Sequence, residues 1–312
     1  MFIKNSLSLF INNINLSLKA MLYRLIVVSL FTALIAVVCD VNMSVITDSA
    51  ELKDFTESIR SALSGFLGAD YSFGKDVAET YGALSALISA NAPSIIGVII
   101  ISFIIVYIET FLLGISHFAL TKCVNFHMQS LTKIGFFEAI FTSLRSSAPF
   151  EALYAVIKTL VVILTLAASG LFVVYTMEYL SLFSMIIGMW IMIFLFSMYL
   201  TLTVLIRPCV VNGAKTSAAF KTKFGRKKFW TCFGSFVISL TVGIVVNVVF
   251  FLTTFGAGLM ISVPLTALFF ACLKLVVYYN VNDKKYYIDI DNIVTPVILR
   301  EDGEFLDKVD VQ

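Results

Sequence analysis

The sequence predicts an all-α membrane protein with six transmembrane helices, and its composition is the first observation behind that prediction. Of the 312 residues, 59% are hydrophobic and only 13% are charged, and the mean hydropathy is +0.96. Soluble domains are on average about 45–50% apolar and about 25% charged. The chain therefore has too little polar surface for a water-soluble globule, which excludes a soluble enzyme.

The second observation is the length of the uncharged runs. A membrane-spanning helix needs about 20 apolar residues, and six runs reach that length. They cover residues 21–39, 95–120, 152–176, 182–206, 229–252 and 258–279. The first run follows basic residues, as the core of a signal peptide does, but it is longer than such a core and lacks a small-x-small cleavage site. We therefore expect it to be retained as a membrane helix.

The third observation is the distribution of charge, which predicts the orientation because cytoplasmic loops keep Lys and Arg. Segment 40–93 contains three basic and eight acidic residues and is expected outside. The connection 207–228 contains seven basic residues and no acidic one and is expected inside. These charges place both termini in the cytoplasm. We expect the membrane to be the bacterial cytoplasmic membrane. The predicted domains are a transmembrane domain, 1–279, and an acidic cytoplasmic tail, 280–312.

Three segments of similar shape precede pairs of spans, which suggests three diverged helix-plus-hairpin repeats. Their shared triplets are Ser8-Leu9-Phe10, Ala139-Ile140-Phe141 and Ala218-Ala219-Phe220. In the first segment one helical face is apolar and the opposite face is polar. The apolar face holds Ile3, Leu7, Phe10, Ile11 and Ile14, and the polar face holds Lys4, Asn12 and Asn13. Such helices lie in the membrane interface beside anionic headgroups; the alternative is a set of basic loops with chance periodicity.

Two further segments are predicted to fold outside the bilayer. Within 40–93, apolar residues recur at helical spacing over 52–66 and again over 77–88, so we expect two amphipathic helices that cover the outer mouth of the bundle or dock a partner. In the tail, Tyr287–Ile290 alternates as a strand does, and 293–299, interrupted at Pro296, could complete a small β-hairpin.

The last third of the chain carries a family resemblance. Residues 217–240, SAAFKTKFGRKKFWTCFGSFVISL, place a basic, Phe-containing helix before a span, and the next span contains Pro264 and ends in Tyr278-Tyr279. This pattern resembles bacterial six-span proteins grouped with the membrane domain of glycerophosphoryl diester phosphodiesterases and with the YciC-like inner-membrane proteins. No catalytic phosphodiesterase domain accompanies it, so the resemblance implies an accessory or transport-like membrane module.

Ionisable residues inside spans are functional candidates because burying them in lipid is costly. Arg24, Lys158, Arg207 and Lys274 lie near predicted cytoplasmic ends, where long basic side chains can snorkel to the headgroups. Glu109 lies near the middle of the second span and cannot.

Three interpretations of Glu109 stay open. It pairs with Lys158, it is a protonated carboxyl bonded to Ser or Thr, or it coordinates a transported proton or cation. Asn247 and Pro264 would be companions in a polar cavity.

Motif chemistry is not indicated. The five cysteines form no CxxC pair, only two histidines occur, and nucleotide-binding, zinc-protease and hydrolase motifs are missing. We therefore expect no enzyme activity, no metal and no cofactor.

The leading hypothesis is a non-catalytic accessory or membrane-organising protein that contacts membrane lipids, with anionic headgroups at its cytoplasmic face. The alternative is a transporter or permease subunit working with a separate cytoplasmic ATPase. In either case a basic patch would bind anionic lipid or the protein partner. The patch comprises Lys215, Lys221, Lys223, Arg226, Lys227 and Lys228. Nucleic acid is not an expected partner.

Overall fold

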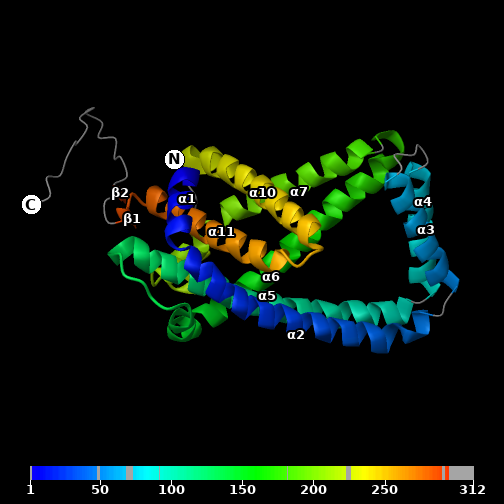
Figure 1. Ribbon diagram of the computed structural model, residues 1–312, viewed down its shortest axis with the longest axis horizontal. Helices are drawn as coiled ribbons and strands as arrows, with labels where there is room; N and C mark the ends of the chain where they lie inside the picture. The colour runs from blue at the N-terminus through cyan, green and yellow to red at the C-terminus, as the bar shows by residue number, and fades with distance from the viewer. Residues whose placement is uncertain are drawn as a thin grey trace, which may run out of the picture. The chain divides into compact units, whose positions relative to one another are not determined.

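The computed structural model describes residues 2–47, 50–67, 73–90, 92–180, 182–222, 226–289 and 292–294. These residues are helical almost throughout, and six helices are long and apolar enough to cross a membrane (Figure 1). The candidate spans lie in α2 (Ile14–Thr47), α5 (Ala92–Ser130), α6 (Phe136–Leu180), α7 (Leu182–Leu202), α10 (Arg226–Thr254) and α11 (Leu259–Val281). The predicted fold class, an all-α six-span membrane protein, is confirmed.

The remaining elements are short or lie between spans. They are α1 (Phe2–Asn12), α3 (Ala50–Leu67), α4 (Phe73–Ala90), α8 (Ile206–Val211), α9 (Thr216–Ala219), β1 (Tyr286–Asp289) and β2 (Asn292–Val294). Helices α3 and α4 pack side by side as a hairpin (Figure 1), as the two apolar periodicities predicted.

Three spans lie in helices that are longer than expected, namely α2 with 34 residues, and α5 and α6. Helices α5 and α6 contain 39 and 45 residues, and at about 1.5 Å per residue each exceeds the roughly 30 Å hydrocarbon core of a bilayer. The segment 121–151, which separates the second and third predicted spans, is therefore mostly helix. Helix α5 ends where Leu131 adopts a φ of 57° and its N–H donates to the carbonyl of His127 at 2.9 Å.

The chain packs as two compact units. Unit 1 contains 1–21, 117–147 and 200–312, and unit 2 contains 22–116 and 148–199. The chain passes from one unit to the other within α2, α5, α6 and α7.

In unit 1, α11 is the most deeply buried of the spans and α10 the least. Phe10 of α1 meets Phe269 of α11 edge to face, and Phe236 of α10 stacks on Phe270. Helix α1 also contacts β1. The strands pair antiparallel, with Tyr286 opposite Val294. The predicted hairpin is thus present in a shorter form, and 295–299 lie outside the described residues.

The three similar segments take three different forms. The first is a separate helix, α1. The second, from Phe136, runs through Pro149 into its span without interruption. The third is α9, four residues long.

In unit 2, backbone carbonyls accept hydrogen bonds from tyrosines of neighbouring spans. The Tyr23 hydroxyl of α2 donates to the carbonyl of Leu112 on α5 at 3.1 Å. The Tyr107 hydroxyl of α5 donates to the carbonyl of Ala152 on α6, also at 3.1 Å. These bonds fix α5 between α2 and α6.

Candidate functional site

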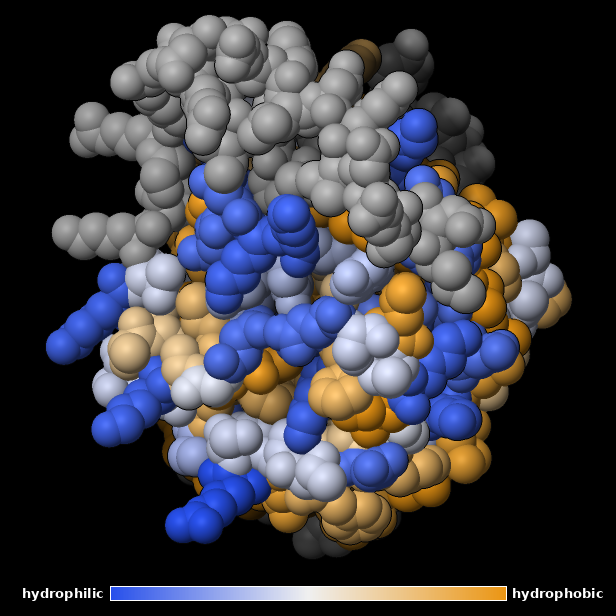
Figure 2. Space-filling view, turned by 90° about the vertical axis from the view of Figure 1, so that its left-hand side faces the viewer, coloured by the Kyte–Doolittle hydropathy of each residue, from blue (hydrophilic) through white to orange (hydrophobic). Residues whose placement is uncertain are grey.

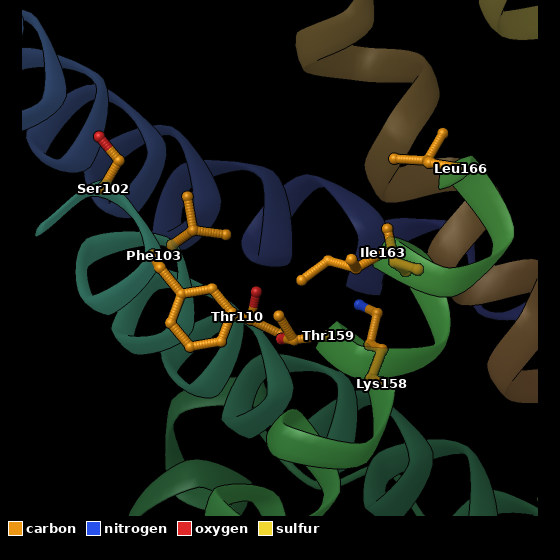
Figure 3. Close-up of a pocket in the computed structure, with 9 residues that line it drawn as sticks. Ser102, Phe103, Thr110, Lys158, Thr159, Ile163 and Leu166 are labelled. Carbon is orange, nitrogen blue, oxygen red and sulfur yellow. The ribbon is translucent and has the colours of Figure 1, made fainter. Parts of the chain in front are cut away.

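A groove between α5 and α6 holds two of the predicted candidates in unit 2. It has a volume of about 430 Å³, and we call it the α5–α6 groove (Figure 3). It is lined by Ser102, Phe103, Val106 and Thr110 of α5 and by Lys158, Thr159, Val162, Ile163 and Leu166 of α6. Its walls are mainly hydrocarbon, with Lys158, Ser102 and two threonines as the polar exceptions.

Glu109 lies beside the α5–α6 groove and is half-buried. Lys158 acts on its carboxylate electrostatically. The structure therefore brings together the two residues that the sequence analysis paired in the first of its three interpretations.

A second carboxylate on this helix pair was missed by the sequence analysis. Glu151 of α6 is only 1% exposed, and its carboxylate lies against Gly114 of α5. A Cβ atom on residue 114 would come within 2.5 Å of Oε2 of Glu151. Any other residue at this position would force the Glu151 carboxylate to shift. Glu151 lies one residue before the third predicted span, 152–176, and so was not among the intramembrane candidates.

Asn247 and Pro264 belong to unit 1, and their environment is a contact between two helices. Asn247 of α10 donates to the carbonyl of Gly243 at 2.8 Å and accepts from the hydroxyl of Ser262 on α11 at 2.6 Å. Thr266 of α11 lies close to Gly243. Pro264 is buried within α11. Asn247 thus bridges α10 and α11 through bonds that the chain itself supplies.

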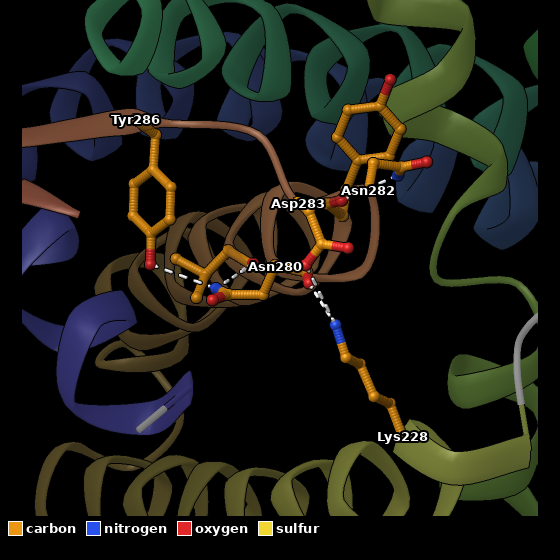
Figure 4. A network of polar contacts seen from close by, with 7 residues as sticks. Lys228, Asn280, Asn282, Asp283 and Tyr286 are labelled. Carbon is orange, nitrogen blue, oxygen red and sulfur yellow. Dashed lines mark hydrogen bonds and ion pairs between the residues drawn. The ribbon is translucent and has the colours of Figure 1, made fainter. Parts of the chain in front are cut away.

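A polar network in unit 1 joins the two ends of the chain (Figure 4). The buried phenol oxygen of Tyr286 accepts from the amide of Asn5 at 2.8 Å and from that of Asn280 at 3.1 Å. Lys228 donates to the carbonyl of Asn280 at 2.6 Å and lies 3.5 Å from a carboxylate oxygen of Asp283. We call these five residues the Tyr286 network.

Burial raises the pKa of the Tyr286 phenol, while the two amides that donate to it act in the opposite direction. The neutral phenol is therefore the form that the fold favours.

Other side chains hold the same hairpin and the adjoining helices. The amide of Asn12 donates to the carbonyl of Ile288 at 3.0 Å. The Tyr279 hydroxyl donates to Asn125 at 2.9 Å, and Gln129 donates to Asn212 at 2.9 Å. Hydrophilic side chains gather on this end of unit 1, which carries α1 and the strands (Figure 2).

The basic patch divides in the structure. Lys215 and Lys221 are exposed. Lys228 is also exposed, and it belongs to the Tyr286 network. The side chains of Lys223, Arg226 and Lys227 lie outside the described residues.

Snorkelling is the wrong explanation for three of the basic residues in the spans. Arg24, Arg207 and Lys274 are 7%, 7% and 8% exposed. They are covered by protein rather than extended toward headgroups. Lys158 is half-buried and faces the α5–α6 groove.

Within the described residues, no three His, Cys, Asp or Glu side chains are placed to hold a metal ion. The chain matches no protein-family model, no curated protein and no solved structure.

Proposed function

We propose that the chain is a non-catalytic accessory protein of the bacterial cytoplasmic membrane that organises anionic lipid around its N-terminal helix. Both termini are cytoplasmic in this proposal, and kinship with the six-span proteins named above is part of it. The carrying observation is that α1 presents two different faces.

One face of α1 packs on protein. Phe2, Ser6, Leu9 and Asn13 are buried, and the helix contacts α11 and β1. The Tyr286 network holds this face in place through Asn5.

The other face of α1 is an exposed apolar stripe that continues into α2. It comprises Leu7, Ile11, Ile14 and Leu18, between 44% and 59% exposed. Lys4 and Lys19 are exposed on the same segment. A helix with an apolar stripe and adjacent lysines suits the membrane interface, where each lysine contributes about 1 kcal/mol near anionic lipid.

The selectivity of the protein for anionic lipid tests the proposed lipid-organising role. In vesicles of phosphatidylglycerol and phosphatidylcholine, the spin-label spectrum of the wild-type protein should show phosphatidylglycerol enriched in the motionally restricted lipid. Replacing Lys4 and Lys19 by Gln should remove most of that enrichment, whereas Lys75→Gln, on the α3–α4 hairpin, should not. Equal enrichment in all three proteins would reject the role.

Cysteine labelling tests the orientation. In a cysteine-free background, a membrane-impermeant reagent should modify Ser85→Cys in intact cells and Ser217→Cys only after permeabilisation. The reverse pattern would overturn the assigned topology.

A transporter or permease subunit is the second candidate, and the α5–α6 groove with its Glu109 and Lys158 pair favours it. In this case the basic patch would receive a cytoplasmic ATPase. Complementation of a deletion strain separates the candidates: loss of function in Glu109→Gln with normal folding supports transport, and loss in the Lys4 and Lys19 variant alone supports the accessory role.

A further inference from the structure

We propose that the α5–α6 groove binds one long-chain fatty acid, with its carboxylate on Lys158 and Thr159 and its hydrocarbon chain along the apolar walls. This inference does not depend on the accessory role.

The size and lining of the groove suit such a ligand. Small-molecule pockets measure roughly 300–1,000 Å³ and combine apolar walls with a few placed polar groups, and this groove has about 430 Å³. Lys158 and Thr159 are adjacent on α6. From there to Leu166 the groove is walled mainly by Val162, Ile163 and Phe103 (Figure 3), over about 12 Å of helix.

The hydroxyl of Thr159 lacks a partner. Thr159 is 8% exposed, and its Oγ1 makes no hydrogen bond to any described residue. Threonines elsewhere in the spans donate to the carbonyl four residues earlier, as Thr121 and Thr241 do at 2.8 and 2.9 Å. A few buried serine hydroxyls are also unpaired, namely Ser116, Ser147, Ser184 and Ser239, but none of them lines the groove.

An unpaired hydroxyl is costly in a membrane, where water does not compensate. Thr159 lines the groove, and because its hydroxyl is enclosed in the ligand-free structure, a rotation about χ1 would turn it toward an acceptor there.

The charge of Lys158 selects the kind of acceptor. An ammonium group deep in apolar surroundings favours an anion over a neutral oxygen. A carboxylate presents two oxygens, one for the ammonium of Lys158 and one for the hydroxyl of Thr159.

Glu109 competes with this ligand because it also acts on Lys158. A bound carboxylate takes over the interaction with the ammonium, and the negative charge of Glu109 opposes its approach. Removing that charge should not weaken binding, whereas removing the Lys158 charge should.

A fatty acid fits better than a diacyl phospholipid. The groove runs between only two helices and offers space for one chain. Lys158, Thr159 and Thr110 lie at one end of the groove, and Ser102 is the one polar lining residue at the other end (Figure 3), so the lining offers no extended polar site for a glycerol and a larger headgroup.

Photolabelling tests the site directly. The full-length protein, stripped of lipid in detergent, is irradiated with a palmitate analogue carrying a mid-chain diazirine. The adducts should map to peptides containing Phe103–Val106 and Val162–Leu166. Excess oleate should suppress them, while methyl oleate, which lacks the carboxylate, and dioleoyl phosphatidylglycerol should not.

Matched variants complete the test. Lys158→Gln should reduce labelling about tenfold, the loss of one charged hydrogen bond, and Thr159→Val should reduce it several-fold. Glu109→Gln should label at least as strongly as the wild type, and Lys75→Gln and Thr241→Val should label equally. Undiminished labelling of Lys158→Gln, equal competition by methyl oleate or phosphatidylglycerol, or loss of labelling in Glu109→Gln would each overturn the proposal.

Discussion

The Tyr286 network of unit 1 and the α5–α6 groove of unit 2 treat polar side chains in opposite ways. In the network, the phenol of Tyr286 and the amides of Asn5 and Asn280 bond to one another. In the groove, the hydroxyl of Thr159 is buried and unbonded among the described residues. Paired polar groups stabilise a fold, and unpaired ones destabilise it unless a ligand completes them. The difference is why we regard the network as structural and propose the groove as a binding site.

The largest expected effect is on the network. Tyr286→Phe removes an acceptor of the buried amide of Asn280 and the half-buried amide of Asn5, which should lower the free energy of unfolding by about 2–4 kcal/mol. Denaturation in detergent, followed by circular dichroism, measures the change. Tyr287→Phe on the same strand is the control and should behave as wild type. A Tyr286→Phe protein as stable as this control would show that the network is dispensable.

Glu151 is a second buried polar residue of unit 2, and its packing against Gly114 can be tested. Gly114→Ala places a methyl group against its carboxylate and should destabilise by about 1–3 kcal/mol, the usual cost of overpacking. Gly97→Ala on the same helix meets nothing within 4 Å and should be neutral or stabilising by about 0.5–1 kcal/mol. Thermal unfolding of the pair gives the measurement, and equal midpoints for the two would contradict the packing of Glu151 on Gly114.

The hydrogen bond between Asn247 and Ser262 is a second contact in unit 1 in which the polar groups bond to each other. Asn247→Ala should cost about 0.6–1.7 kcal/mol, the range for hydrogen bonds between membrane helices. Thr253→Val, whose hydroxyl bonds only within α10, should cost less. If Asn247→Ala retains full stability but loses cellular function, Asn247 belongs to a functional cavity instead.

The smallest expected effect is a fall in the free energy of unfolding at alkaline pH. Because burial raises the pKa of Tyr286 in the folded state, the stabilisation from its neutral phenol is complete below the unfolded value of about 10. It is lost as pH rises through the folded pKa. Stability measured from pH 8 upward should therefore fall more steeply in the wild type than in Tyr286→Phe. Parallel curves would contradict the assignment.

The sequence predicted the six spans because a membrane-spanning helix needs a run of apolar residues that can be read locally. It also offered pairing of Glu109 with Lys158 as one of three interpretations, since both are ionisable and lie in consecutive spans.

The Tyr286 network could not be predicted in this way. Asn5 and Tyr286 are 281 residues apart, and neither stands out among neighbouring polar residues. A tyrosine in an alternating strand beside a span end is a weak signal at best.

Burial by protein was also invisible to the sequence. Arg24 and Lys274 looked like snorkelling residues because only their distance along the helix was known. Glu151 looked like a loop residue because the predicted span begins at 152. In the structure α6 begins fifteen residues before Glu151 and continues through Pro149. The unpaired state of Thr159 depends on a rotamer and on the absence of a nearby acceptor, which no sequence pattern encodes.

The stability of Thr159→Val in lipid-free detergent tests the central claim most directly. Valine has the shape of threonine without the hydroxyl, so if that hydroxyl is unpaired and awaits a ligand, the variant should be as stable as the wild type or more stable by up to about 1–3 kcal/mol. Adding oleate should then stabilise the wild type more than the variant. A Thr159→Val protein that is less stable than wild type by more than about 1 kcal/mol without ligand would show that the chain already satisfies this hydroxyl, and the contrast between network and groove would fail.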